Sequence, residues 1–304
     1  MIARRALVCL AVVLAPFGCT ARALDLPQDL GPDLSVFDLF PGDFAMQRHA
    51  TCPAGTNFIF TIDEDTTLSR FNPTTAQFFD AGPIVCPAQP SAEIDSMGVD
   101  REGNGWVLYT SGELFRLLTD SLSCTSTTFG GLPNPVFAGM SFAEDTPGSA
   151  SETLYVTPSA NNDTELVKID LTTFTLSNVA ALAGPPPGPE LTGDDQGNLW
   201  AFFPSEGTSP FIARVNKSTG AFDRTIELPA LQGSPGGYGM AGYQGDFYLF
   251  FELENGLSPT GPSTNVYRVD GQTGQLSTLL TNTGRNIVGV GAATCAGDGL
   301  DGLE

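Results

Sequence analysis

Basic residues are scarce in this sequence. Only 13 Lys and Arg stand against 34 Asp and Glu, which gives a formal net charge of −21 at pH 7. Nucleic acids and anionic membranes are bound through positive patches, so we expect neither as a partner. The chain also lacks the paired-cysteine pattern of zinc sites, a phosphate-binding glycine loop and a serine nucleophile elbow. The sequence therefore predicts no cofactor and no metal.

Long apolar runs are also missing after the first twenty residues, so we expect no membrane span. At the start of the chain, Arg4–Arg5 precede a short apolar run, Ala6–Gly18, and Ala21–Ala23 forms a small-x-small cleavage site. This order is typical of a secretory signal peptide, here residues 1–23. Cys19 offers an alternative, a lipid-anchored form. In both cases we predict an extracytoplasmic protein.

Helical periodicity is absent, and a short pattern recurs in its place: apolar, any residue, basic, apolar, then usually Asn or Asp. Its basic residues lie 46, 52, 46 and 54 positions apart. A period in this range indicates one supersecondary unit copied in tandem. The five copies are Leu68–Asn72, Leu114–Leu118, Leu166–Asp170, Ile212–Asn216 and Val266–Asp270.

Each unit combines a glycine-containing stretch, an aromatic and β-branched run, the basic pattern and a more polar strand. Four short antiparallel strands repeated around a ring form a β-propeller. The first unit, from Phe58, lacks its glycine-containing strand, while Ile287–Ala293 is such a strand with no unit after it. We therefore predict an all-β, five-bladed propeller over 52–296 in which the C-terminal strand completes the first blade. Six blades are the alternative. Residues 24–51 are expected to form an acidic, Pro-containing spacer, and residues 297–304 an acidic tail.

Four cysteines remain after the signal region, and an exported chain is expected to pair them. Cys295 would end the closing strand, and Cys52 precedes the second strand of the same blade. We predict that these two residues form a disulfide that pins the ring shut. Cys86 then pairs with Cys124 by elimination.

Two turns carry a family resemblance. Asp100–Trp106 and Asp194–Trp200 share Asp, Gly-Asn and Trp at nearly the same spacing. These turns resemble bacterial propeller repeats of the streptogramin-lyase, NHL and gluconolactonase-like group. The resemblance implies the fold. It implies no lyase activity, because those enzymes rely on a catalytic His and the one histidine here, His49, precedes the first blade. The central cation-binding set of gluconolactonase-like propellers has no full match.

The expected function is a non-catalytic, monomeric binding module with a protein or glycan ligand over the central channel. Asp100, Glu144, Asp194 and Tyr243 are the predicted lining residues. One alternative is a carbohydrate- or lactone-active hydrolase that uses central acidic residues, and another is a surface-attached structural lipoprotein. The further acidic residues near the inner strands are Asp95, Asp145, Glu190 and Asp195.

Two acidic stretches are weaker candidates for binding a cation. Asp63–Asp65 falls where a turn is expected, and Asp298, Asp301 and Glu304 lie in the tail. Acidic residues are ordinary in turns, so we interpret the first stretch as a turn and the second as a solvated tail.

The five repeated basic residues share a strand face with apolar neighbours. An Arg stem can pack along apolar surface while its head pairs with an acidic group. We therefore predict contacts between adjacent blades, rather than ligand contacts, for Arg70, Arg116, Lys168, Arg214 and Arg268.

Overall fold

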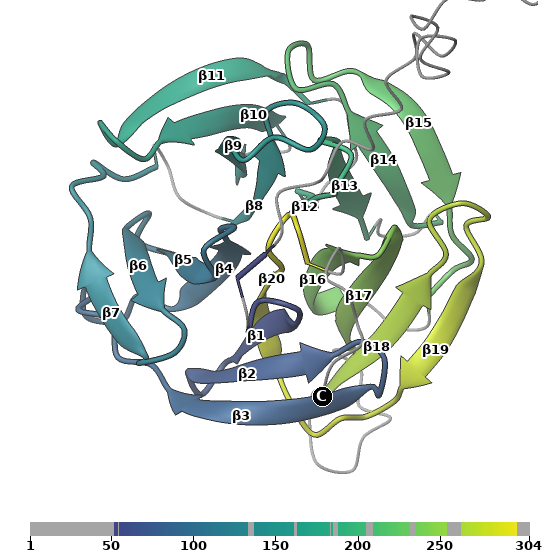
Figure 1. Cartoon of the computed structure of the whole chain (residues 1–304), viewed down its shortest axis with the longest axis horizontal. Coiled ribbons are helices and arrows are strands. Elements are labelled where there is room, and N and C mark those ends of the chain that lie inside the picture. Colours follow the sequence, from purple (N-terminus) through teal and green to yellow (C-terminus); the bar gives the residue numbers. More distant parts are fainter. Residues whose placement is uncertain are drawn as a thin grey trace, which may run out of the picture. The chain divides into compact units, whose positions relative to one another are not determined.

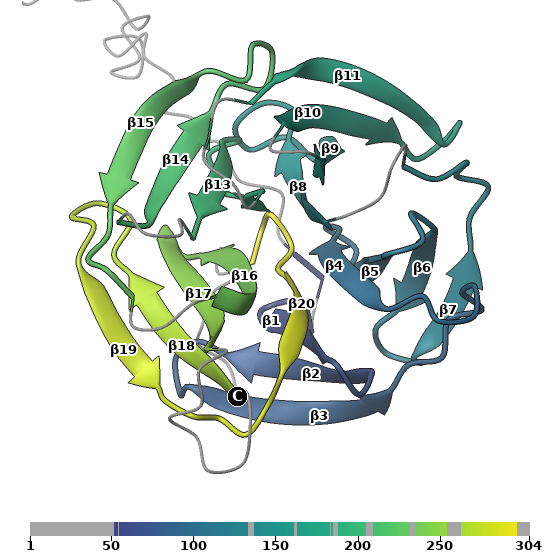
Figure 2. The ribbon, with the colours of Figure 1, turned by 180° about the vertical axis from the view of Figure 1, so that it is seen from behind.

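The computed structural model describes residues 52–53, 55–132, 137–160, 163–182, 184, 188–204, 209–231, 235–253 and 263–296. The predicted signal peptide, spacer and tail, with Cys19 and His49, lie outside the described residues. The described part forms a ring of five four-stranded antiparallel sheets (Figures 1 and 2). The predicted five-bladed propeller is thus confirmed. No described helix is long and apolar enough to span a membrane.

The blades are numbered here in chain order, and each runs from an innermost strand at the axis to an outermost strand. Blade 1 contains β20 (Ile287–Gly291), β1 (Ile59–Asp63), β2 (Thr67–Asn72) and β3 (Gln77–Pro83). Blade 2 contains β4 (Ile94–Val99), β5 (Asn104–Tyr109), β6 (Leu114–Leu118) and β7 (Ser123–Ser126). Blade 3 contains β8 (Phe137–Glu144), β9 (Glu152–Ala160), β10 (Asp163–Asp170) and β11 (Thr175–Ala181). Blade 4 contains β12 (Glu190–Gly193), β13 (Leu199–Phe203), β14 (Phe211–Val215) and β15 (Phe222–Glu227). Blade 5 contains β16 (Pro235–Tyr243), β17 (Asp246–Leu253), β18 (Ser263–Val269) and β19 (Leu276–Leu280).

The core lies between the blades. Every residue of the second strands β1 and β13 is buried, whereas β3 and β11 are largely exposed. Aromatic and β-branched side chains suit strands covered on both faces, which explains why the hydrophobic runs of the repeat become second strands.

Glycine lets the innermost strands approach one another closely. A Cβ on Gly139 would lie 2.2 Å from the carbonyl oxygen of Pro189, and one on Gly193 would lie 2.2 Å from that of Phe142. The start of β8 (Gly139) therefore lies beside the start of β12 (after Pro189), and the last part of β8 (Phe142) lies beside the end of β12 (Gly193). These neighbouring strands run in the same direction. Hydroxyl groups complete the packing, since Thr192 Oγ1 accepts a hydrogen bond from Gly242 N of the next blade at 2.7 Å.

The ring closes as predicted. β20 pairs antiparallel with β1, with Thr61 opposite Val290. Cys52 and Cys295 form a disulfide across 243 positions of sequence, with their Cα atoms 5.4 Å apart. Cys86 and Cys124 form the second, which joins the segment after β3 to β7 of blade 2. Both predicted pairings are confirmed.

Candidate binding face

The C-terminal ends of the five innermost strands share one side of the ring, which we call the C-terminal face. The four predicted lining residues lie at these ends. Asp100 follows β4, Glu144 ends β8, Asp194 follows β12 and Tyr243 ends β16. They differ in what their side chains do.

Asp100 holds the turn between β4 and β5. Its Oδ1 accepts hydrogen bonds from the backbone and side-chain nitrogens of Asn104, at 2.8 and 3.0 Å. Its Oδ2 accepts from Asn104 Nδ2 at 2.9 Å and from Trp106 Nε1 at 2.9 Å. Gly103 takes the positive φ of +81° that the turn requires. The spacing of Asp, Gly-Asn and Trp therefore encodes a closed hydrogen-bonded turn, in which Asn acts as a donor.

Asp194 repeats this arrangement in blade 4. It accepts from Asn198 N and Asn198 Nδ2, both at 2.8 Å, and from Trp200 Nε1 at 2.7 Å. Gln196 N adds a fourth bond at 3.0 Å. The acceptor sites of both carboxylates are thus largely occupied within their own turns.

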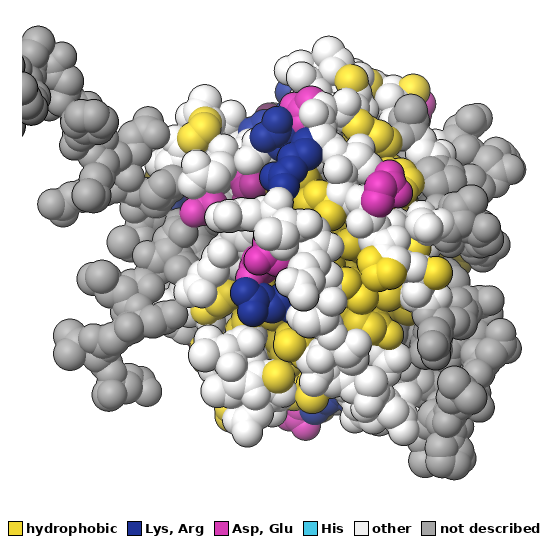
Figure 3. All heavy atoms as spheres, turned by 90° about the vertical axis from the view of Figure 1, so that its right-hand side faces the viewer, with side chains coloured by type: hydrophobic (Ala, Val, Ile, Leu, Met, Phe, Trp, Pro, Cys, Tyr) yellow, Lys and Arg dark blue, Asp and Glu magenta, His cyan; other side chains and the backbone are white. Residues whose placement is uncertain are grey.

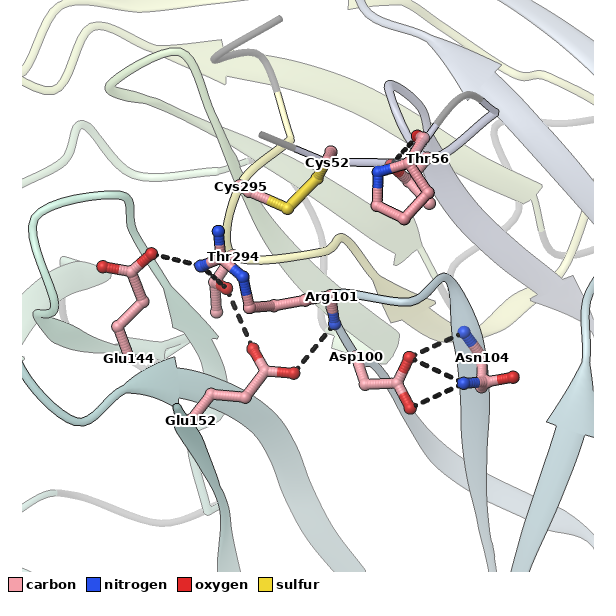
Figure 4. Close-up of a disulfide and its surroundings, with 10 residues drawn as sticks. Cys52, Thr56, Asp100, Arg101, Asn104, Glu144, Glu152, Thr294 and Cys295 are labelled. Atoms are coloured by element: carbon pink, nitrogen blue, oxygen red, sulfur yellow. Dashed lines mark hydrogen bonds and ion pairs between the residues drawn. A yellow bond between two sulfur atoms is a disulfide. The ribbon is translucent and has the colours of Figure 1, made fainter. Parts of the chain in front are cut away.

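Glu144 belongs to a buried network at the centre of the face (Figure 4). It is fully buried and forms an ion pair with Arg101, which is 5% exposed and comes from the neighbouring blade. Arg101 Nη1 also donates to Thr294 Oγ1 at 3.2 Å, and Arg101 N donates to Glu152 Oε1 at 2.8 Å. Thr294 Oγ1 in turn donates to Glu152 Oε2 at 2.9 Å. The network joins blades 2 and 3 to the C-terminal segment beside the Cys52–Cys295 disulfide.

Burial raises the pKa of Glu152 in this network to about 7, against the lowering effect of the hydrogen bonds from Arg101 and Thr294. The repeat pattern does not indicate Arg101, because this residue stands outside the repeated basic positions. The only sequence feature that could have indicated a role for Arg101 is its position next to Asp100 in a polar turn.

Tyr243 lies at a cavity of about 210 Å³ between blades 4 and 5, which we call the seam cavity. Asp194 lines the same cavity, which also reaches Thr294 and Ala296 near the axis. The structure therefore brings two of the four predicted residues, Asp194 and Tyr243, to one cavity. Asp100 and Glu144 do not line it.

Aromatic and basic side chains form the outer part of the seam cavity. The guanidinium groups of Arg214 and Arg224 lie 6.0 and 5.5 Å from the ring centroid of Trp200. Arg224 also donates to the carbonyl oxygens of Gly271 and Gln272 in blade 5, at 2.7 and 3.3 Å. Arg224, which the repeat pattern does not contain, thus joins blade 4 to blade 5.

The repeated basic residues make fewer contacts between blades than expected. Arg70 does bind Asp120 of blade 2, at 2.8 Å. The ion pairs of Arg214 with Asp223 and of Arg268 with Asp246 stay within single blades.

In both pairs the acidic partner lies on the adjacent strand of the same blade, so neither ion pair joins two blades. No ion pair of Arg116 or Lys168 is found among the described residues. On the side of the ring that carries blades 4 and 5, basic side chains lie beside acidic ones, and hydrophobic side chains are visible next to them (Figure 3).

The N-terminal ends of the innermost strands, on the other side of the ring, carry a second group of carboxylates. Asp95 Oδ2 accepts from Ala138 N at 3.0 Å, and Ser96 Oγ lies 3.5 Å from Glu190 Oε2. Blades 2 and 4 are not neighbours in the ring, so Glu190 reaches toward β4 across the end of blade 3. Burial raises the pKa of Asp95 to about 7. Burial, and then the charge of Asp95, raise the pKa of Glu190 well above its ordinary value.

The Asp63–Asp65 stretch is arranged around an arginine. Asp63 Oδ2 accepts from Arg285 Nη1 at 2.7 Å, while Asp65 Oδ1 accepts from Thr67 N at 3.0 Å. Burial raises the pKa of Asp63 to about 6. Among the described residues no three His, Cys, Asp or Glu side chains form a group that could hold a metal ion. The tail residues Asp298, Asp301 and Glu304 lie outside the described part.

Comparison with known proteins gave distant similarities to solved structures. No protein-family model matches the sequence, and no curated protein matches it. Among solved structures, Kuenenia stuttgartiensis hydrazine synthase is 12% identical, with a TM-score of 0.40, over 76% of this chain and 68% of that one. The Dos1 propeller is also 12% identical, with a TM-score of 0.41, over 74% of this chain and 56% of that one. At these values neither similarity bears on activity.

Proposed function

We propose that this chain is an exported, non-catalytic binding module whose ligand occupies the seam cavity on the C-terminal face. The observation that carries the proposal is that Asp194 and Tyr243, from two different blades, line one cavity. Concave sites lined by aromatic groups and a few polar groups are where proteins bind small ligands or parts of larger ones. The lining turns stand on β-strands that are fixed by the propeller, so the site is preformed.

Export is part of the proposal. The two disulfides support it, because such bonds form and persist in oxidising compartments. Mass spectrometry of the exported protein should find a mature N-terminus at Leu24. A lipidated Cys19 would favour the surface-anchored alternative.

Matched turns allow a direct test of the binding site. Gln196 lines the cavity, whereas Glu102 has the same position in the equivalent turn of blade 2 and does not line it. Both side chains are exposed, so alanine at either position should leave the fold intact. The purified protein would be screened against immobilised glycans and peptides, and each bound species retested with both variants. Weaker binding by Gln196→Ala alone supports the proposal; equal binding by both variants contradicts it.

The second candidate function is a hydrolase, and the Asp95 and Glu190 carboxyls favour it. Sugar hydrolysis uses one protonated and one ionised carboxyl group. Burial raises the pKa values of both carboxyls, and the charge of Asp95 raises that of Glu190 further, so one can stay protonated while the other is ionised. Release of nitrophenol from nitrophenyl glycosides, abolished by both Asp95→Asn and Glu190→Gln, would establish this activity. If no glycoside in the panel is cleaved, the hydrolase candidate is rejected and the binding function remains.

A further inference from the structure

We propose that the ligand of the seam cavity is a neutral carbohydrate, bound through one of its sugar rings. This inference rests on the proposed function and adds the chemical class of the ligand. It is argued from the composition of the cavity mouth, from the charges around it and from its size.

Three exposed glutamines from three separate turns meet at the cavity. Gln196 comes from the turn between β12 and β13, Gln244 from that between β16 and β17, and Gln272 from that between β18 and β19. A primary amide carries both donors and acceptors. A sugar hydroxyl is likewise both a donor and an acceptor, so amide groups match it better than groups of one charge sign.

The charged groups of the lining are mostly paired inside the protein. Arg224 binds the carbonyl oxygens of blade 5, and Arg214 Nε donates to Asp223 Oδ1 at 2.5 Å. Asp246 accepts from Arg268 Nε at 2.7 Å and from Gly271 N at 3.1 Å. An ionic ligand would have to compete with these partners, whereas a neutral ligand leaves them in place.

Aromatic side chains supply the apolar part of the site. Trp200, Tyr243 and Phe247 all line the cavity and are nearly buried, at 3%, 5% and 4% exposure. Sugar rings present C–H groups on one face and hydroxyls at their edges, which suits aromatic walls below an amide rim. The cavity volume of about 210 Å³ lies below the roughly 300–1,000 Å³ of drug-sized pockets, so it fits a single ring better than a folded peptide segment.

The chain contains its own control for a spectroscopic test. It has two tryptophans, Trp106 and Trp200, held by equivalent bonds to Asp100 and Asp194. Only Trp200 lines the seam cavity. Trp106→Phe therefore leaves Trp200 as a fluorescent reporter in the site. Trp200→Phe leaves Trp106 as a reporter in a matched turn that does not line the cavity.

The experiment titrates both proteins with neutral hexoses and their methyl glycosides. Galacturonate, glucose 6-phosphate and spermidine serve as charged comparators. We expect a saturable change in emission from the Trp106→Phe protein and none from Trp200→Phe. Alanine at Gln196, Gln244 or Gln272 should each weaken the binding by about two- to tenfold, the effect of one neutral hydrogen bond. Calorimetry on the wild-type chain gives the same affinities without any tryptophan change.

Three results would overturn the inference: binding of the charged comparators only, equal emission changes from both proteins, or no heat with any neutral sugar. The proposed function has a separate outcome. A peptide whose binding is weakened by Gln196→Ala but not by Glu102→Ala would preserve the binding site and reject carbohydrate as its ligand.

Discussion

Asp95 should limit the stability of this protein at neutral pH, and its replacement by asparagine should remove that limit. Asp95 Oδ2 accepts a hydrogen bond from Ala138 N at 3.0 Å. An asparagine side-chain oxygen can accept the same bond, and the amide carries no charge to bury. Asp95→Asn thus tests the burial of charge while keeping the local geometry.

The sign follows from the difference between folded and unfolded states. Burial raises the pKa of Asp95 in the folded protein from 3.8 to about 7. The stability that this group contributes is fully present below about pH 4 and is lost as the pH rises through 7. At about 1.4 kcal/mol for each pH unit, the loss reaches at most about 4 kcal/mol. Because the charge of Asp95 also raises the pKa of Glu190, removing it should flatten the pH dependence further.

The assay is urea unfolding under oxidising conditions at pH 4, 6 and 8, followed by tryptophan fluorescence. We expect Asp95→Asn to exceed the wild type at pH 8 by about 2–4 kcal/mol and to approach it at pH 4. Asp270→Asn is the control, since Asp270 lies in an exposed turn and hydrogen bonds from Thr273 and Gln272 lower its pKa. Between pH 6 and 8, the free energy of unfolding of the control should change with pH as that of the wild type does. If the free energy of unfolding changes equally with pH from 4 to 8 in Asp95→Asn and in the wild type, the reasoning is refuted.

The remaining predictions concern the contacts that hold the ring together. Replacing Cys52 and Cys295 together by serine should lower the free energy of unfolding by about 2–4 kcal/mol, and urea unfolding that matches the wild type would contradict a closing role. Arg101→Met should cost about 3–5 kcal/mol in the same assay, because it leaves a buried carboxylate unpaired; a loss below about 1 kcal/mol would argue against the network. Arg224→Met should lower the free energy of unfolding by about 1 kcal/mol, because its bonds to blade 5 are lost, while Arg116→Met should change it by no more than about 0.5 kcal/mol. The reverse order would show that Arg224 does not stabilise the contact between blades 4 and 5.

Much of the architecture was predictable because the repeat is local. The unmatched glycine-containing strand at Ile287–Ala293 indicated how the ring closes, and the position of Cys295 on that strand indicated the partner of Cys52. These inferences need only the order of strands within a unit. The blade count follows from the same order.

The site was less predictable because it depends on neighbours across blades. The spacing of Asp194 and Trp200 indicates a tight turn. That Trp200 Nε1 donates a hydrogen bond to the Asp194 carboxylate is visible only in the structure. The contact between Ser96 and Glu190 joins blades that are not adjacent, so no strand pattern could indicate it. The basic residue of the repeat marks a strand position, whereas the choice of its partner depends on which acidic side chain lies nearest.

The central claim is that ligands bind at the seam between blades 4 and 5. Crystallographic screening of small polar and aromatic fragments tests this most directly, because the fragments locate a binding site whatever the natural ligand is. The account predicts that bound fragments concentrate in the cavity lined by Asp194, Tyr243 and Gln244. Fragments that gather elsewhere on the ring and leave this cavity empty would contradict it.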